Sequence, residues 1–285
     1  MRYPLKVWRQ HLVPQHALTT FAGMLSHSEI PWLKNYLIRY FLKRYNVNMN
    51  EALEPNPFAY PSYHEFFIRR LKPGSRPIDA SPTSIVSPCD GTISQMGKIE
   101  GNSLLQAKGR HFSLEALVGS HEDAKAFENG HFATIYLAPI DYHRVHMPLS
   151  GTLTHLRYIP GELFSVNPLT TDHVDNLFAR NERVVTFFKH DHGSFAIILV
   201  GAMIVGSIFT RWGGNVTPHR AKKILDISYP NLPEQHIRLD KGDEMGYFAL
   251  GSTVIVLLDA KMQWEYDLSQ NSRLVVGQGI GHLLP

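Results

Sequence analysis

The sequence is poor in the features that mark several common protein classes. It holds one cysteine, Cys89, among 285 residues, which excludes an internal disulfide framework and fits a reducing compartment. No Gly-rich phosphate loop follows an expected strand and opens a helix, so we do not expect a nucleotide-binding βαβ fold. The first ten residues lack the apolar run and cleavage site of a signal peptide, and we expect none.

Long uncharged runs are also scarce. Residues 194–210 form one such run of 17 residues, which is the lower limit for crossing a membrane. Gly201 and Gly206 interrupt its β-branched pattern, and His192 and Arg211 bound it closely. The pattern favours two short buried strands over a transmembrane helix.

Acidic residues are scarce in the first 45 positions, where Glu29 faces seven lysines and arginines. This segment therefore carries a charge of +6 in a chain whose total is +3. Eight aromatic residues are interleaved with the cations. Such a mixture suits either nucleic acid or an anionic membrane surface.

The clearest helix of this segment is expected to begin at Pro31, a good first-turn residue. One face gathers most of its apolar residues, which are Trp32, Leu33, Tyr36, Leu37, Tyr40 and Phe41. Ile38 and Leu42 blur the division between this face and the polar one. The pattern is typical both of a helix packed on a core and of a helix lying in a membrane interface.

The rest of the chain reads as a Pro-rich joint followed by a β-rich body. Residues 46–86 hold six prolines, with a short helix expected over 63–70. Strands are expected near 85–86, 91–94, 133–137, 184–188 and 254–258, and helices near 113–118 and 172–178. The predicted fold class is α+β, with amphipathic N-terminal helices before a mostly antiparallel β-sandwich or barrel.

A Gly-Ser pair, Gly251-Ser252, stands at the start of the last expected strand. Glycine has no side chain to shield its carbonyl, and it tolerates backbone conformations that other residues cannot. If the fold strained this bond and a base removed the hydroxyl proton, Ser252 could attack the Gly251 carbonyl. The pair alone is a weak signal, so its meaning depends on partners elsewhere.

Candidate partners occur in two other motifs. Asp90 lies in the turn 87–91, where an Asp before Gly often only shapes the turn. His143 and His146 stand at i and i+3 in YHRVH, which could be half of a zinc site lacking its third ligand. A serine, a histidine and an aspartate can also form an oriented nucleophile in any chain order.

These motifs occur in the order and spacing of a known family. The segments that carry the match include HEFFIRRLKPGSRPID, SPCDGTISQMGKIE, YHRVHMPLSG, YIPGELFSVN and MGYFALGSTVIVL, and they run over almost the whole chain. On these segments the chain resembles the bacterial, pyruvoyl-dependent phosphatidylserine decarboxylases.

The resemblance implies that the chain is a precursor that cuts itself between Gly251 and Ser252. It assigns the family's catalytic triad to Asp90, His146 and Ser252. An N-to-O acyl shift and an elimination would leave a β-chain ending at Gly251 and an α-chain, 252–285, capped by a pyruvoyl group. The prosthetic group would thus come from Ser252, with neither a metal nor pyridoxal phosphate.

The resemblance also implies the reaction. The pyruvoyl ketone would form a Schiff base with the amine of phosphatidylserine and act as an electron sink while carbon dioxide leaves, giving phosphatidylethanolamine. The family assigns the first histidine of YHRVH, here His143, to this decarboxylation step. Tyr136 and Ser165 are candidate substrate-binding residues.

A lipid substrate gives the basic N-terminal segment a role. Residues 1–45 are expected to be membrane-associating helices that bind an anionic surface, with roughly 1 kcal/mol from each near-surface cation. Residues 46–285 would be the catalytic domain. The resemblance further implies a homodimer of cleaved α and β chains, peripheral on the cytoplasmic face of the bacterial inner membrane, without a nucleic-acid partner.

Two other functions stay open on the residues alone. A metal-dependent hydrolase could use His143 and His146 together with His190 or His192. A non-catalytic membrane or carrier module is the second alternative, because the turn KGDEMGYF resembles those of lipoyl-type and sugar-phosphotransferase-type β domains.

Overall fold

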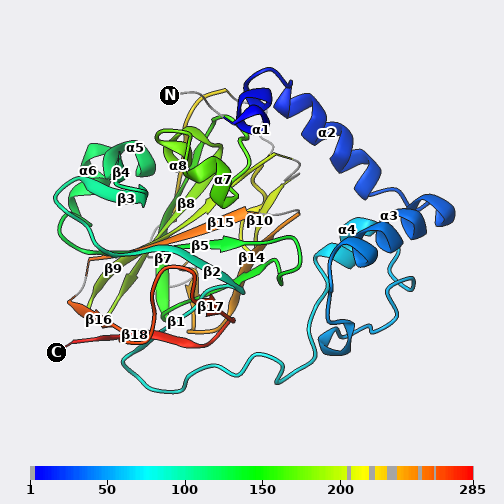
Figure 1. The fold of residues 1–285 in the computed structure, drawn as a ribbon. Helices are drawn as coiled ribbons and strands as arrows, with labels where there is room; N and C mark the ends of the chain where they lie inside the picture. Colours follow the sequence, from blue (N-terminus) through cyan, green and yellow to red (C-terminus); the bar gives the residue numbers. More distant parts are fainter. Residues whose placement is uncertain are drawn as a thin grey trace.

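A large antiparallel sheet organises the molecule (Figure 1). The computed structural model describes residues 4–203, 207–217, 222–229, 236–249, 252–259 and 261–284. Within them the main sheet has nine strands, in the order β12 (Leu225–Ser228), β7 (Gly151–Ile159), β8 (Arg183–His190), β9 (Gly193–Val200), β15 (Ser252–Leu258), β5 (His131–Leu137), β2 (Gly91–Lys98) and β17 (Arg273–Leu274), with β13 (Arg238–Leu239) also paired to β7.

Smaller antiparallel sheets complete the β body. One has the order β11 (Gly214–Asn215), β10 (Ile208–Thr210), β14 (Glu244–Phe248) and β6 (Arg144–His146). Another joins β1 (Ser84–Val86), β18 (Gly279–Leu283) and β16 (Met262–Trp264), and a hairpin joins β3 (Ser103–Ala107) to β4 (Arg110–Ser113). With the helices, this arrangement confirms the predicted α+β class with antiparallel sheets.

Helices precede and flank this body. The N-terminal ones are α1 (Leu5–Trp8), α2 (Gln15–Ser26), α3 (Pro31–Arg44) and α4 (Tyr63–Phe67), and the later ones are α5 (Leu114–Val118), α6 (His121–Lys125), α7 (Pro168–Thr171) and α8 (Leu177–Arg180). Short 3₁₀ turns cover Arg9–His11 and Met49–Glu51. In Figure 1, α2 and α3 lie along the outside of the β body, and α3 lies beside α4.

The centre of the main sheet is covered on both faces. Every residue of β15 is buried, and so are six of the eight residues in each of β8 and β9, which explains their continuous apolar sequences. The described part of the uncharged run 194–210 forms β9 and β10, as predicted, while residues 204–206 lie outside the described residues. Among the residues that the structure describes, no helix is long and apolar enough to cross a membrane.

Helix α3 begins at Pro31 as predicted, but its apolar residues divide between two faces. Ile38 and Phe41 are buried against the phenylalanines of α4. The other face presents Trp32, Tyr36 and Tyr40, of which 72%, 61% and 62% is exposed. The prediction that Phe41 shares one face with these three aromatics is therefore wrong, because Phe41 packs inward.

Two other helix predictions need correction. Helix α4 ends at Phe67 and does not reach residue 70. The helix expected over 172–178 is replaced by α7 and α8 on either side of a turn. The Asn167 side chain accepts a hydrogen bond from the Thr170 amide and starts α7 early. Asn176 then takes φ of 56°, which a right-handed helix cannot contain.

Candidate active site

Ser252 is the first residue of the fully buried strand β15. It lies opposite Leu137 of β5 and is 0% exposed. Its hydroxyl Oγ has no hydrogen-bond partner among the described residues. A buried hydroxyl without a partner destabilises a fold, which makes it a candidate for function. Gly251, on the other side of the expected cleavage bond, lies outside the described residues.

Two histidines present free ring nitrogens in the same way. Nδ1 of His143 lies 2.8 Å from the carbonyl oxygen of Asp141, and Nδ1 of His146 lies 2.8 Å from that of Gly242. A carbonyl only accepts hydrogen bonds, so Nδ1 carries the proton in both rings. Each Nε2 therefore holds a lone pair, and both are buried without a partner in the described part of the chain.

Strand pairing brings His143 into the region of Ser252. Leu137, at the end of β5, pairs with Ser252, and the Phe248 amide donates to the His143 carbonyl at 3.0 Å. Residue 137 is thus held beside residue 252, and residue 143 beside residue 248. His146 follows on β6, which pairs with β14 just before the same segment.

The surroundings leave the two rings with different basicity. Burial is the largest cause that lowers the pKa of His143 to about 3; the Asp141 carbonyl opposes this shift, and the nearby Arg69 charge adds to it. Burial also lowers the pKa of His146, but the Gly242 carbonyl, Glu244 and Asp90 oppose that shift. Two carboxylates, those of Glu244 and Asp90, thus raise the pKa of His146, whereas none is among the causes that act on His143.

Asp90 lies beside His146 without a hydrogen bond to its ring. The His146 amide donates to the Pro88 carbonyl at 2.7 Å, which holds the Asp90 turn next to β6. The carboxylate, however, accepts from Nε and Nη2 of Arg76 and from the Val276 amide at 2.6–3.1 Å. Asp90 therefore acts on His146 through its charge, because Gly242 occupies Nδ1.

The glycine after Asp90 makes this packing feasible. A Cβ at Gly91 would lie 2.7 Å from both the Tyr136 carbonyl oxygen and the Ile135 side chain. Only glycine therefore lets β2 start this close to β5 and carry the Asp90 turn into the interior.

Sequence reasoning missed several residues that hold the histidines. Asp141 is buried, its carboxylate accepts from the Ala138 amide at 2.8 Å, and it pairs with Arg273. Gly242 has φ of +88°, which a residue with a side chain adopts only with strain, and its carbonyl holds His146. The ring centroids of Phe67 and His143 lie 4.3 Å apart. Two features of the sequence could have indicated these residues. Asp141 lies just before YHRVH, and Gly242 lies in a Lys-Gly-Asp turn.

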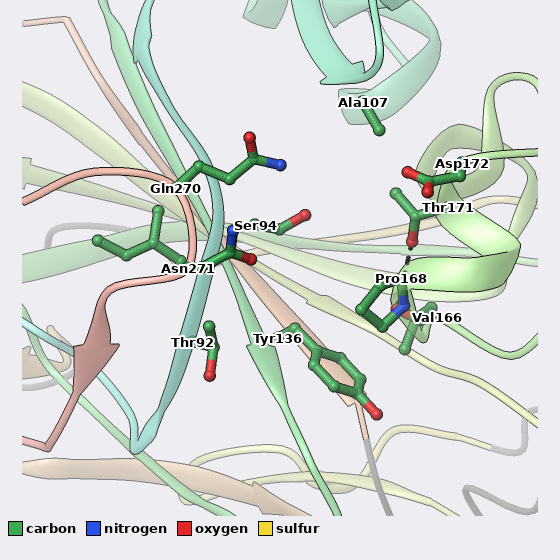
Figure 2. A pocket seen from close by; sticks show the side chains of 11 residues that line it. Thr92, Ser94, Ala107, Tyr136, Val166, Pro168, Thr171, Asp172, Gln270 and Asn271 are labelled. Carbon is green, nitrogen blue, oxygen red and sulfur yellow. Dashed lines mark hydrogen bonds between the residues drawn. The ribbon is translucent and has the colours of Figure 1, made fainter.

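Tyr136 lies on the other face of the sheet from Ser252. Directly opposed residues of antiparallel strands share a face, and Tyr136 opposes Thr92 and Thr253 while Ser252 opposes Leu137. Figure 2 shows Tyr136 lining a small cavity with Thr92 and Val166. Ser165 is the neighbour of Val166, and its hydroxyl accepts from Asn167. Tyr136 and Ser165 are thus near one cavity, and their roles stay predictions.

The histidines of the metal-hydrolase alternative do not meet. His190 and His192 belong to the hairpin between β8 and β9, which lies at the Leu258 end of β15, whereas Ser252 is at the other end. Across the described ranges, no group of three or more His, Cys, Asp or Glu side chains is arranged to hold a metal ion.

A buried serine hydroxyl near two neutral histidine bases defines a candidate acyl-transfer site on an antiparallel sheet. The sequence model of the phosphatidylserine decarboxylase family matches residues 63–282, and a further model described as PSD matches residues 5–46. This chain belongs to the phosphatidylserine decarboxylase family, which confirms the resemblance in the sequence.

Individual relatives match over most of their length. A phosphatidylserine decarboxylase proenzyme of Shewanella putrefaciens is 51% identical over 254 residues, which is 89% of this chain and 88% of that protein. The proenzyme of Stutzerimonas stutzeri is 47% identical over 283 residues, which is 99% of this chain and 95% of that protein.

Acid should weaken the fold through its buried neutral histidines. Burial lowers the pKa of His143 to about 3 and of His64 to about 4, against 6.5 for the free side chain. The unfolded chain therefore binds more protons below pH 6.5, so stability is complete above that pH and falls toward pH 4, by up to about 1.4 kcal/mol per pH unit and group. Urea unfolding should give a lower free energy at pH 5 than at pH 7.5.

The variant His143→Gln should reduce this difference, because it removes one of the groups that must stay neutral. If the free energy of unfolding changes between pH 7.5 and pH 5 by the same amount in His143→Gln and in wild type, His143 is not one of the buried neutral groups.

Proposed function

We propose that this chain decarboxylates phosphatidylserine to phosphatidylethanolamine and carbon dioxide, after cutting itself between Gly251 and Ser252. The observation that carries the proposal is the buried Ser252 hydroxyl, without a partner among the described residues, in the region of two histidines whose Nε2 atoms hold lone pairs. This geometry fits a prosthetic group made from Ser252, because the hydroxyl forms no hydrogen bond that holds the described part of the fold together.

In the cleavage step, Nε2 of His146 takes the proton from the Ser252 hydroxyl. The oxygen attacks the Gly251 carbonyl, the carbon–nitrogen bond breaks, and the proton passes to the freed nitrogen. Loss of the Cα proton then expels Gly251 as a carboxylate, and water replaces the nitrogen, which leaves as ammonia. Asp90 stabilises the transient His146 cation through its negative charge.

The resulting pyruvoyl ketone supplies an electron sink for the carbon–carboxylate bond of the bound substrate. The chain contributes a dry environment, since His143 is fully buried and lies against the ring of Phe67. Such a site favours conversion of a carboxylate into neutral carbon dioxide. Nε2 of His143, which holds a lone pair, can accept the proton that the substrate ammonium must lose before it condenses and then deliver it to the α-carbon of the product.

The N-terminal helices would bring the protein to its lipid substrate. Large apolar side chains are exposed along them, namely Trp8, Leu12, Phe21, Met24, Ile30, Trp32, Tyr36 and Tyr40. Lys43, Arg44 and the other cations of the segment supply attraction to anionic lipid. We propose peripheral membrane binding through this surface. A homodimer and the cytoplasmic face of the inner membrane stay predictions.

Replacing the two histidines should separate cleavage from decarboxylation. His146→Gln should slow self-cleavage by about 10²–10⁴-fold, since it removes the base. His143→Gln should cleave into two chains but release little carbon dioxide. Denaturing gels and trapping of ¹⁴C-labelled carbon dioxide from carboxyl-labelled phosphatidylserine measure the two steps.

Thr134→Val is a matched control, because Thr134 also has a buried hydroxyl without a partner among the described residues but lies away from the site. It should cleave and decarboxylate as wild type does. Full carbon dioxide release by cleaved His143→Gln would remove His143 from the reaction.

The exposed aromatic face of α3 gives a second prediction. The triple variant Trp32→Ser, Tyr36→Ser, Tyr40→Ser should keep the fold, because these side chains are exposed. It should bind vesicles of phosphatidylglycerol and phosphatidylethanolamine at least about tenfold more weakly, since each aromatic ring contributes on the order of 1 kcal/mol when it leaves water. Vesicle co-sedimentation measures this.

The control is Tyr266→Ser, which removes an aromatic residue that is 91% exposed outside the N-terminal helices. It should bind like wild type. Equal binding by the triple variant and wild type would mean that α3 is not the membrane surface.

A further inference from the structure

Arg69 is a buried cation without a partner. It is 5% exposed, its buried Nε has no hydrogen-bond partner, and no ion pair to its guanidinium is found among the residues that the structure describes. Its Cζ lies 5.9 Å from the centroid of the Phe66 ring. Burial lowers the pKa of Arg69, in keeping with an environment that solvates the charge poorly. An unpaired buried charge is costly, and it persists where a ligand supplies the counter-ion.

The Arg69 side chain lines two cavities. One has a volume of about 360 Å³ and is lined in part by Tyr60, Arg70 and Arg144. The other has a volume of about 190 Å³ and is lined in part by Asp90, Asp141 and Tyr142. The larger volume lies within the range of small-molecule sites, roughly 300–1,000 Å³.

The other charges around Arg69 are already paired. Arg144 binds Glu244 at 2.6 Å and donates to the Ile68 carbonyl at 2.9 Å. In the smaller cavity, Arg76 binds Asp90 and Glu51, and Arg273 pairs with Asp141. The Asp90 charge acts on Arg69 favourably from a distance, but no acid of the described residues forms a direct ion pair with Arg69.

Arg69 also lies between the exposed aromatic helix and the histidines. It follows α4, which lies beside α3 (Figure 1) and packs on its inner face. The exposed Trp32, Tyr36 and Tyr40 are on the outer face of α3. On the other side, Phe67 contacts the His143 ring and the Arg69 charge acts on that ring. A lipid whose acyl chains stay near α3 would carry its headgroup past Arg69.

We propose that Arg69 binds the phosphodiester of the lipid headgroup while the seryl end reaches Ser252 and His143. This inference rests on the proposed function. A guanidinium presents paired donors that match two phosphate oxygens, and such charge-assisted bonds are strong in a site sheltered from water.

The reaction itself favours the phosphodiester over the substrate carboxylate as the partner of Arg69. The carboxylate loses its charge as carbon dioxide forms, so a guanidinium bound to it would stabilise the ground state and slow the reaction. The phosphodiester keeps its charge throughout. Its contact with Arg69 should therefore lower KM and leave kcat little changed.

Steady-state kinetics of Arg69 variants with dihexanoyl phosphatidylserine test the proposal. Arg69→Gln should cleave itself like wild type and raise KM about 10- to 100-fold, as expected for loss of a charged hydrogen-bonded contact, with kcat within about threefold. Arg69→Lys should recover part of the affinity, because the charge returns without the paired donors. Arg238→Gln, at an exposed arginine of β13, is the matched control and should behave like wild type.

A binding measurement on the purified protein, whether or not it has cut itself, separates this proposal from the proposed function. Calorimetry with glycerophosphocholine, a phosphodiester whose quaternary amine cannot condense with a ketone, should show binding to wild type and at least tenfold weaker binding to Arg69→Gln. Inorganic phosphate is the second probe, and it should bind more weakly than the diester. Tighter binding of inorganic phosphate would assign the site to free phosphate and overturn the headgroup assignment.

Stability distinguishes a binding role from a structural one. Removing an unpaired buried charge should leave the Tm of Arg69→Gln equal to or above that of wild type. The proposal is overturned if Arg69→Gln has the KM of wild type or binds glycerophosphocholine as tightly as wild type. It is also overturned if Arg69→Gln and Arg69→Lys both have a lower Tm than wild type and still bind the diester. Absence of self-cleavage in wild type would contradict the proposed function, while the diester measurement would still decide on Arg69.

Discussion

The hydrogen bonds from Nδ1 of His143 and His146 to main-chain carbonyls are the interactions on which the site depends. Each bond holds a ring in place and fixes its tautomer, so both Nε2 atoms face the buried interior as bases. The carbonyls belong to Asp141 and to Gly242, and Gly242 has the left-handed backbone conformation that favours glycine. Burial then lowers both pKa values, which keeps the rings neutral and able to accept a proton.

The sheet supplies the other half of this arrangement. Strand β15 is buried along its whole length, so Ser252 starts in a region that water does not reach. Its pairing with β5, and the bond between Phe248 and His143, bring two distant segments together at the point where the chain is expected to cut itself. Arg76 holds the Asp90 carboxylate in place, and that carboxylate acts on His146 through its charge without bonding to its ring. The proposed nucleophile, its proposed base and the charge proposed to support that base thus come from three different parts of the chain.

Much of the fold could be predicted from the sequence, because its strongest signals are local. The β-branched runs around 133–137, 184–188 and 254–258 form β5, β8 and β15, and Pro31 begins α3. Motif spacing also identified the serine, the histidines and Asp90 as candidates. The partners of these residues were not predictable in the same way, since Gly242 lies 96 residues from His146 and Val276 lies 186 from Asp90. The division of α3 into a buried and an exposed face likewise depends on its packing against α4, and the sequence pattern of α3 alone does not predict that packing.

The central claim is that Ser252 serves first as a nucleophile and then as the prosthetic group. An intact-mass spectrum of the purified wild-type protein tests it most directly. The account predicts two chains, one ending at Gly251 and one of residues 252–285 whose mass fits a pyruvoyl group in place of the N-terminal serine. A single uncut chain, or a small fragment that begins with an unmodified serine, would contradict it.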